Sequence, residues 1–255
     1  MFLGGGASTA EAASGDIPLD PARLAARNHN RSTVVSQRGM VCSSQPLASV
    51  AGLDVLKKGG SAIDAAICAN AVLSVVEPMS CGPGGDLFAI LWSEGDQQLF
   101  GLNASGRAPY DWSLEAASKL GISSIPTYSP LAWSVPGCVS GWGALHGRFG
   151  KLGFGEVLEA SIDYARNGFP VSPIIARGWL GDRHRKYPTL YKTYAPDGKP
   201  PGFGDVFRNP GMADFLDIIA KGGADAFYRG EVAERIVKFS RAWSGYFSTQ
   251  FASWS

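Results

Sequence analysis

The sequence lacks an excess of charge of either sign. Its 255 residues include 23 Lys and Arg against 22 Asp and Glu, so the formal net charge is +1. A nucleic-acid-binding surface needs clustered basic residues, and a disordered acidic tail needs a run of like charges, so this balance disfavours both classes. Because 45% of the residues are hydrophobic, the chain is long and apolar enough to fold around a sizeable core.

Cysteine and histidine are scarce. The sequence contains four cysteines and three histidines: Cys42, Cys68, Cys81, Cys138, His29, His146 and His184. The cysteines form no CxxC pair, and the histidines lack the spacing of metal ligands. We therefore expect reduced thiols, a cytoplasmic location, and neither a metal ion nor another cofactor.

Long apolar runs are also missing. Residues 1–20 have neither a basic start nor a continuous apolar core, so they do not resemble a signal peptide. The apolar segment 62–77 is too short to span a bilayer, so we predict no membrane contact. Residues 1–36, rich in Gly, Ala, Ser and Asn, predict a flexible N-terminal tail before a folded part at 37–255.

A buried helix is the clearest element that the sequence predicts. Ser61 and Asp64 have the spacing of a capping box, so we expect the helix to begin at Ala62. Pro78 disfavours helical dihedral angles in the residue before it, so the helix should end at Glu77. Almost no polar face exists between these ends, which predicts a helix that is buried on all sides.

A glycine-rich turn follows at 80–86. Its glycines permit positive φ angles and a close approach by other backbone or by a ligand, so we predict that they line a pocket: Gly82, Gly84 and Gly85. The turn lacks a Walker lysine and the GxGxxG pattern, which disfavours phosphate binding. The next segments, 87–92 and 99–103, predict two strands joined by a polar turn.

The remaining pattern is mostly helical. Apolar periodicity and end signals predict further helices at 46–58, 114–120, 138–149, 155–167, 212–220 and 230–239. The first of them should pack against the buried helix as a hairpin. We also predict a short strand over 38–44, an irregular segment over 186–211 and an unfinished element over 241–255, as in the front part of a longer protein.

No convincing pair of nucleophile and base appears. Residues 137–141 resemble a nucleophile elbow only superficially, because Ser140 falls one place late for GxSxG. Arg107 is the most informative charge, since Gly106 and Pro109 restrict its backbone and its guanidinium can bind a carboxylate with two hydrogen bonds. An ordinary structural ion pair fits the spacing of Arg107 equally well.

Several motifs occur in a characteristic order. They lie at 39–41, 45–49, 52–60, 62–66, 76–78, 82–85, 135–137 (Val-Pro-Gly), 150–152 and 165–172 (Ala-Arg-Asn-Gly-Phe-Pro-Val-Ser). From about residue 36 to the C-terminus, the chain resembles the start of the large subunit of the γ-glutamyltranspeptidases. The resemblance implies an α+β fold, the αββα sandwich of N-terminal-nucleophile hydrolases, incomplete in this chain.

The resemblance also implies a chemistry. Family members are precursors that cleave themselves and free a threonine at the start of a small subunit; that threonine is the nucleophile and its α-amine the base. They act on glutathione or another γ-glutamyl amide. The threonine would lie beyond Ser255, so we expect no catalytic residue in this chain, no activity from it alone, and a small subunit from the same precursor as its partner.

One departure concerns the substrate. The transpeptidases bind the substrate α-carboxylate with an arginine in an Arg-Glu-x-Ala-Pro context, whereas residues 103–109 are Asn-Ala-Ser-Gly-Arg-Ala-Pro. Ser105 therefore occupies that position and Arg107 follows two residues on. We predict that both bind substrate above a pocket wall formed by Gly82, Gly84 and Gly85. A shift of two residues along a strand keeps the same face and moves the guanidinium by about 6–7 Å.

Two alternatives stay open. The Ser-Gly-Arg-Ala-Pro form resembles the branch of cephalosporin acylases and small-amide amidohydrolases, which implies an amidohydrolase acting on another carboxylate-bearing amide. A truncated, non-catalytic relative is the other alternative. As an isolated fragment, the chain should leave the sheet edge and apolar helix faces uncovered, which predicts poor solubility or association.

Overall fold

The computed structural model describes residues 2–4, 33–181 and 184–248. The strands are β1 (Phe2–Gly4), β2 (Leu87–Ser93), β3 (Gln98–Ala104), β4 (Phe169–Pro170) and β5 (Val206–Phe207). The helices are α2 (Pro46–Lys57), α3 (Ala62–Val76), α4 (Leu114–Lys119), the 3-10 helix η1 (Pro130–Ala132), α5 (Cys138–Phe149), α6 (Phe154–Asn167), α7 (Pro173–Gly178), α8 (Pro188–Tyr194), α9 (Pro210–Gly222), α10 (Asp225–Tyr228) and α11 (Glu231–Ala242).

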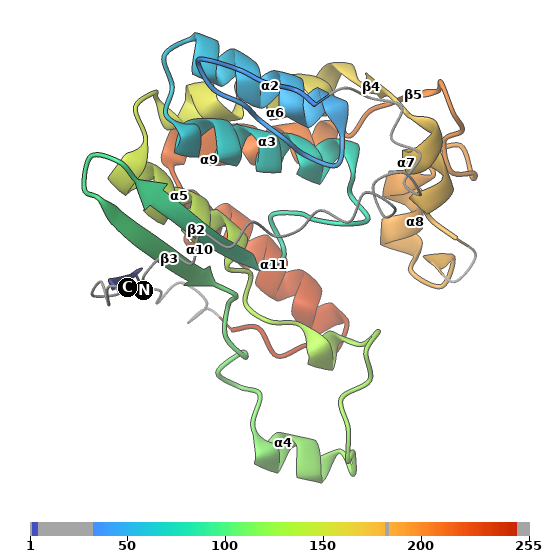
Figure 1. The fold of residues 1–255 in the computed structure, drawn as a ribbon. Coiled ribbons are helices and arrows are strands. Elements are labelled where there is room, and N and C mark those ends of the chain that lie inside the picture. Colours follow the sequence, from blue (N-terminus) through green and yellow to red (C-terminus); the bar gives the residue numbers. More distant parts are fainter. Residues whose placement is uncertain (1, 5–32, 182–183, 249–255) are drawn as a thin grey trace, which may run out of the picture.

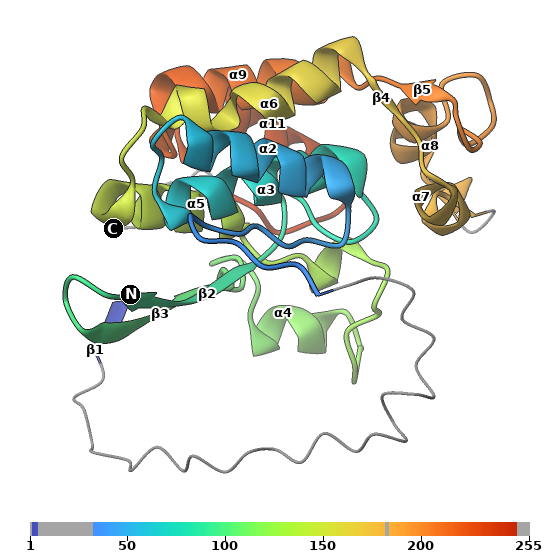
Figure 2. The ribbon, with the colours of Figure 1, turned by 45° about the horizontal axis from the view of Figure 1, so that its top comes forward.

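The elements form layers (Figure 1). Helices α2, α3, α6 and α9 lie together in one layer, and α5 lies between that layer and the sheet. Figure 2 shows all of these helices on the same side of the β2–β3 hairpin, while α7, α8, β4 and β5 form a separate lobe. None of the helices in the described ranges combines the length and hydropathy needed to cross a membrane.

The sheet is antiparallel, with the strand order β1-β3-β2. Both predicted strands are confirmed, and the β2–β3 register pairs Leu87 with Ala104 and Ser93 with Gln98. Side chains alternate between the helical layer and solvent, as the pleat of a strand requires. Strand β1 lies within the segment for which we predicted a flexible tail, and residues 5–32 of that segment lie outside the described residues.

The capping box at the start of α3 is confirmed. The Ser61 N–H donates to Asp64 Oδ2 at 2.9 Å, and the Asp64 N–H donates to Ser61 Oγ at 3.1 Å. The helix ends at Val76, one residue earlier than predicted. Complete burial was wrong for its first two turns, because Ala62 and Ala66 lie on one exposed side.

The predicted pairing of α2 with α3 is confirmed by a close approach. A Cβ atom at Gly52 of α2 would lie 2.9 Å from the carbonyl oxygen of Ala65, so only glycine fits where the helices meet. The other predicted helices are also present, with ends shifted by at most three residues. Their caps and apolar periodicity are local signals, which explains the agreement.

Two predictions about the less regular segments were wrong. Residues 38–44 form no strand, because they pair with no neighbouring strand in the described part of the chain. The segment 186–211, predicted to be irregular, contains α8 and β5. Strand β5 exists through its pairing with β4, which places Phe207 opposite Phe169, and such a short strand has no pattern of its own.

Helices α7 and α10 were not predicted. Helix α7 has a recognisable start, since Ser172 accepts a hydrogen bond from the Ile175 N–H at 3.4 Å and Pro173 occupies the first turn. Helix α10 spans a single turn, Asp225–Tyr228. A helix this short carries too few residues to show a period of 3.6.

Candidate functional site

Three backbone segments meet beside the end of β3. They are the turn Gly82–Gly85, the segment Ala104–Arg107 and the segment Ser134–Cys138. We call the last of these, Ser134–Cys138, the junction. The Gly85 carbonyl accepts hydrogen bonds from the N–H groups of Gly137 at 3.1 Å and Cys138 at 3.0 Å. The Arg107 carbonyl accepts one from the Val135 N–H at 2.9 Å. The segment that enters α5 is therefore bound to both sides of the candidate site.

Two glycines allow this close approach. Gly106 has a φ angle of +77°, and a Cβ atom there would lie 1.9 Å from the Val135 carbonyl oxygen. A Cβ atom at Gly137 would lie 2.0 Å from the Ala104 carbonyl oxygen. Since real Cβ atoms do not approach backbone so closely, any larger residue would force the segments apart.

Arg107 is presented from a restrained loop and not from a strand. Strand β3 ends at Ala104, and the positive φ angle of Gly106 interrupts the extended backbone. The expectation that Ser105 and Arg107 share a strand face was therefore wrong. The Arg107 side chain is exposed, and its Nη1 donates to the Tyr110 hydroxyl at 2.9 Å.

Ser105 lies on the same loop and is half-buried. Its N–H donates to Asn103 Oδ1 at 3.0 Å, and its hydroxyl donates to the Gly106 carbonyl at 3.4 Å, near the upper limit for such a bond. The bond to Asn103 turns the chain directly after β3. Both predicted substrate-binding residues thus belong to one short loop.

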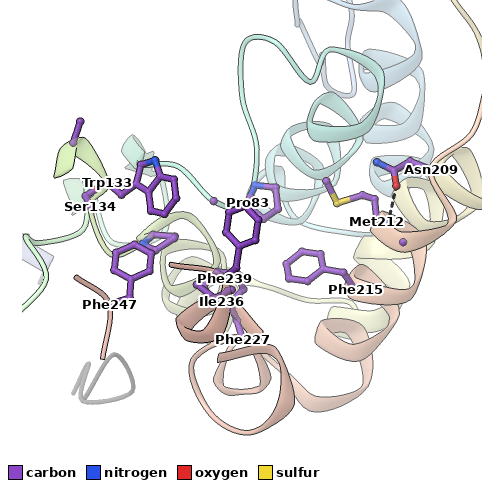
Figure 3. A pocket seen from close by; sticks show the side chains of 14 residues that line it. Pro83, Trp133, Ser134, Asn209, Met212, Phe215, Phe227, Ile236, Phe239 and Phe247 are labelled. Atoms are coloured by element: carbon purple, nitrogen blue, oxygen red, sulfur yellow. Dashed lines mark hydrogen bonds between the residues drawn. The ribbon is translucent and has the colours of Figure 1, made fainter. Parts of the chain in front are cut away.

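The residues of the glycine-rich turn have two different roles. Gly84 and Pro83 line a groove of about 610 Å³, whereas Gly85 holds the start of α5. The groove is lined mainly by apolar and aromatic side chains, including Trp133, Met212, Phe215, Phe227, Ile236, Phe239 and Phe247. Figure 3 shows Trp133 and Phe247 on one side, Met212 and Phe215 on the other, and Pro83 and Phe239 between them. Gly82, Gly85, Ser105 and Arg107 are not among its lining residues in the described ranges.

The buried tyrosine Tyr228 was missed by the sequence analysis. Its hydroxyl donates to the Pro136 carbonyl at 2.7 Å and accepts from the Ser140 N–H at 3.0 Å. Burial raises the pKa of this phenol, so it is a neutral donor at pH 7. Its partners lie 92 and 88 residues away in the sequence, and no local pattern signals such a contact.

The thiols of this region are poor nucleophiles. Burial raises the pKa of Cys81 to about 11 and the pKa of Cys138 to about 12, so both are protonated at neutral pH. All four cysteines of the chain are free. Within residues 2–4, 33–181 and 184–248, no group of three or more His, Cys, Asp or Glu side chains is arranged to hold a metal ion.

The chain has relatives of known class. It is 38% identical over 208 residues to the glutathione hydrolase-like YwrD proenzyme of Bacillus subtilis, which covers 80% of this chain and 39% of that protein. It is 37% identical over 218 residues to the oxamate amidohydrolase proenzyme of Klebsiella pneumoniae, covering 81% and 40%. The crystal structure of a cephalosporin acylase from Bacillus halodurans superposes with a TM-score of 0.80 at 38% identity, covering 88% of this chain and 45% of that one.

The similarity to solved structures shows the fold class of the chain, which is the α+β fold of the N-terminal-nucleophile hydrolases. Residues 48–250 match the family model for γ-glutamyltranspeptidase, and the chain belongs to that family. The resemblance seen in the sequence is therefore confirmed. The family is one of hydrolases and transferases, and the relatives named above are proenzymes. The chain spans about two fifths of the length of those relatives.

Proposed function

We propose that this chain is the front part of a self-cleaving γ-glutamyltransferase or glutathione-hydrolase-like amidase. The observation that carries the proposal is the family match over residues 48–250 together with an exposed arginine on a restrained loop beside β3. The relative named as glutathione hydrolase-like supports the γ-glutamyl substrate. The catalytic threonine lies in the rest of the precursor.

The reaction is acyl transfer. The threonine hydroxyl attacks the amide carbonyl, its α-amine takes the hydroxyl proton, and the amine of the substrate leaves with a proton. Water or a second amine then accepts the acyl group. In this scheme Arg107 pairs with the substrate carboxylate, the Ser105 hydroxyl adds a hydrogen bond, and the Gly82–Gly85 turn forms the adjoining wall. These contacts bind and orient the acyl donor, which raises the effective concentration of the reacting groups.

The first test is Arg107→Ala in the complete precursor. Loss of a charge-assisted hydrogen bond should raise KM for a γ-glutamyl amide by about 10-fold to 100-fold, as measured by steady-state release of the amine. Arg166→Ala is a matched control, because Arg166 is half-exposed on α6 and pairs with Asp214 at 3.0 Å. An unchanged KM and kcat in Arg107→Ala would remove this residue from the site.

A second candidate is an amidohydrolase for another carboxylate-bearing amide. The Klebsiella pneumoniae oxamate amidohydrolase and the cephalosporin acylase favour this alternative. A panel of glutathione, a glutaryl amide and oxamate separates the two, by comparison of kcat/KM values. Self-cleavage of the precursor without turnover of any of these amides would instead favour a relative that only binds a ligand.

A further inference from the structure

We propose that Tyr228 is a positioning residue for the carboxylate-binding loop, acting through the backbone of the junction. Its hydroxyl donates a hydrogen bond to the junction, and the junction in turn donates one to the backbone carbonyl of Arg107. The inference rests on the proposed function, because it assigns Tyr228 a role in the affinity of Arg107 for a substrate carboxylate. Tyr228 itself is not a catalytic residue.

The N-terminus of α5 is capped by distant groups. The N-cap residue is Gly137, which has no side chain with which to accept a hydrogen bond from the first turn. Instead, the Cys138 N–H donates to the Gly85 carbonyl at 3.0 Å, and the Ser140 N–H donates to the Tyr228 hydroxyl at 3.0 Å. The position of α5 therefore depends on these tertiary contacts.

Three consecutive residues of the junction each form a hydrogen bond with a different partner. The Val135 N–H donates to the Arg107 carbonyl, the Pro136 carbonyl accepts from Tyr228, and the Gly137 N–H donates to the Gly85 carbonyl. The Tyr228 hydroxyl thus binds the residue directly after the one that binds Arg107. A shift of the junction must therefore also move the backbone of Arg107, and with it the guanidinium.

The segment has little room to relax independently. A hypothetical Cβ atom at Gly106 would lie 1.9 Å from the Val135 carbonyl oxygen, and one at Gly137 would lie 2.0 Å from the Ala104 carbonyl oxygen. The backbone of the junction and the backbone of Ala104–Arg107 are therefore in direct contact. Close-packed interiors transmit such displacements instead of absorbing them. Loss of the hydroxyl would leave the Ser140 N–H and the Pro136 carbonyl each without one partner, which favours a displaced junction.

The conservative variant is Tyr228→Phe, made in the complete precursor. The ring is 4% exposed and packs against Phe227 with ring centroids 4.7 Å apart, so removal of the hydroxyl preserves the apolar contacts. Tyr194→Phe is the control: Tyr194 is a half-buried tyrosine of α8, and its hydroxyl bonds with Asn209 instead of with the junction. Self-cleavage and the thermal midpoint are measured for each variant.

The readout compares two substrates, γ-glutamyl p-nitroanilide and 4-aminobutyryl p-nitroanilide, which lacks the α-carboxylate. Tyr228→Phe should raise KM for the first by about fivefold and leave KM for the second within twofold. In the Arg107→Ala background, the same change should have no further effect on KM, because both act on one interaction. The Tyr194→Phe control should keep the wild-type values.

Several outcomes would overturn the inference. An equal effect of Tyr228→Phe on both substrates, or an effect that adds to that of Arg107→Ala, would make Tyr228 a purely structural residue. If Arg107→Ala loses the preference for the carboxylate and Tyr228→Phe keeps it, only the inference fails. If neither variant changes that preference, the assignment of Arg107 to the substrate carboxylate fails with it, and if the wild-type precursor shows no such preference, the proposed function fails. Should Tyr228→Phe not fold, replacement by 4-aminophenylalanine, which retains a donor and an acceptor, allows the same comparison.

Discussion

Asp64 joins two distant parts of the chain through one carboxylate oxygen. Oδ2 accepts hydrogen bonds from the N–H groups of Ser61 at 2.9 Å, Lys151 at 2.8 Å and Leu152 at 3.2 Å. Oδ1 has no hydrogen-bond partner among the described residues, and the side chain is 0% exposed. The sequence predicted the cap at Ser61, but the contact with the loop between α5 and α6 appears only in the structure.

The pKa of the Asp64 carboxyl is lowered. Burial acts to raise it, but the hydrogen bonds from the three backbone N–H groups outweigh burial and stabilise the charged form. Because the pKa is lower in the folded state than in the unfolded chain, the charged carboxyl stabilises the fold above a pH of about 4. This stabilisation is lost as the pH falls through the folded-state pKa.

Asp64→Ala should lower the free energy of unfolding by about 3 kcal/mol at pH 7, since three backbone N–H groups lose a buried, charged acceptor. The difference from wild type should shrink as the pH falls below about 4. Urea unfolding of the complete precursor from pH 7 to pH 3 measures both. The control is Asp54→Ala, which removes an exposed pair with Lys57 at 2.9 Å and should cost less than about 1 kcal/mol. Equal losses in the two variants would contradict this account.

At the scale of elements, the position of α5 depends on glycines that serve different purposes. Gly141 lies against the sheet, where a Cβ atom would come within 2.8 Å of Leu87 Cδ2. Gly137 lies against the end of β3, as described above. Gly147 is exposed, with no atom within 4 Å of a hypothetical Cβ atom. Of these three, Gly137 and Gly141 are constrained by packing and Gly147 is not.

Gly137→Ala should therefore destabilise the protein by about 3 kcal/mol or more, because backbone must shift to admit the methyl group. Gly147→Ala should instead stabilise it by about 0.5–1 kcal/mol, since alanine loses less conformational entropy in an exposed helix. Thermal and urea unfolding measure the pair. A Gly137→Ala variant as stable as the wild type would refute the requirement for glycine at the junction.

At the scale of the molecule, one face of the sheet is apolar and is left uncovered by the described residues. Its outward residues Phe88, Ile90, Trp92 and Leu99 are 66%, 81%, 55% and 56% exposed. The helical layer packs on the opposite face. The sequence predicted an uncovered sheet edge and uncovered helix faces, whereas the exposed apolar face in the described structure belongs to the sheet. In the proposed precursor, we expect the remaining layers of the αββα sandwich to cover it.

Ile90→Lys tests this expectation. In the isolated chain, the lysine should reduce association, because it interrupts the exposed apolar face. In the complete precursor, it should impair folding or self-cleavage, because a charge would be buried between layers. Ile174→Lys is the control, since Ile174 is 79% exposed on α7, outside the sheet. Light scattering and gel analysis of cleavage are the measurements; identical behaviour of the two variants would oppose a covered sheet.

The sequence by itself determined the elements whose signals are local. The capping box at Ser61, Pro78 after α3 and the apolar periodicity of α6 each act within a few residues, so helix ends were predicted closely. The alternating pattern of β2 and β3 was equally informative. The order of the motifs also identified the family, because many short matches in sequence do not depend on packing.

Only the tertiary structure decided how these elements define the site. The loop that carries Ser105 and Arg107 takes its shape from the contact of Gly106 with Val135, and the pairing of β4 with β5 has no local signal. The Tyr228 hydroxyl reaches partners 88 and 92 residues away. Such contacts depend on which faces of distant elements pack together, and the local pattern of residue types does not specify that packing.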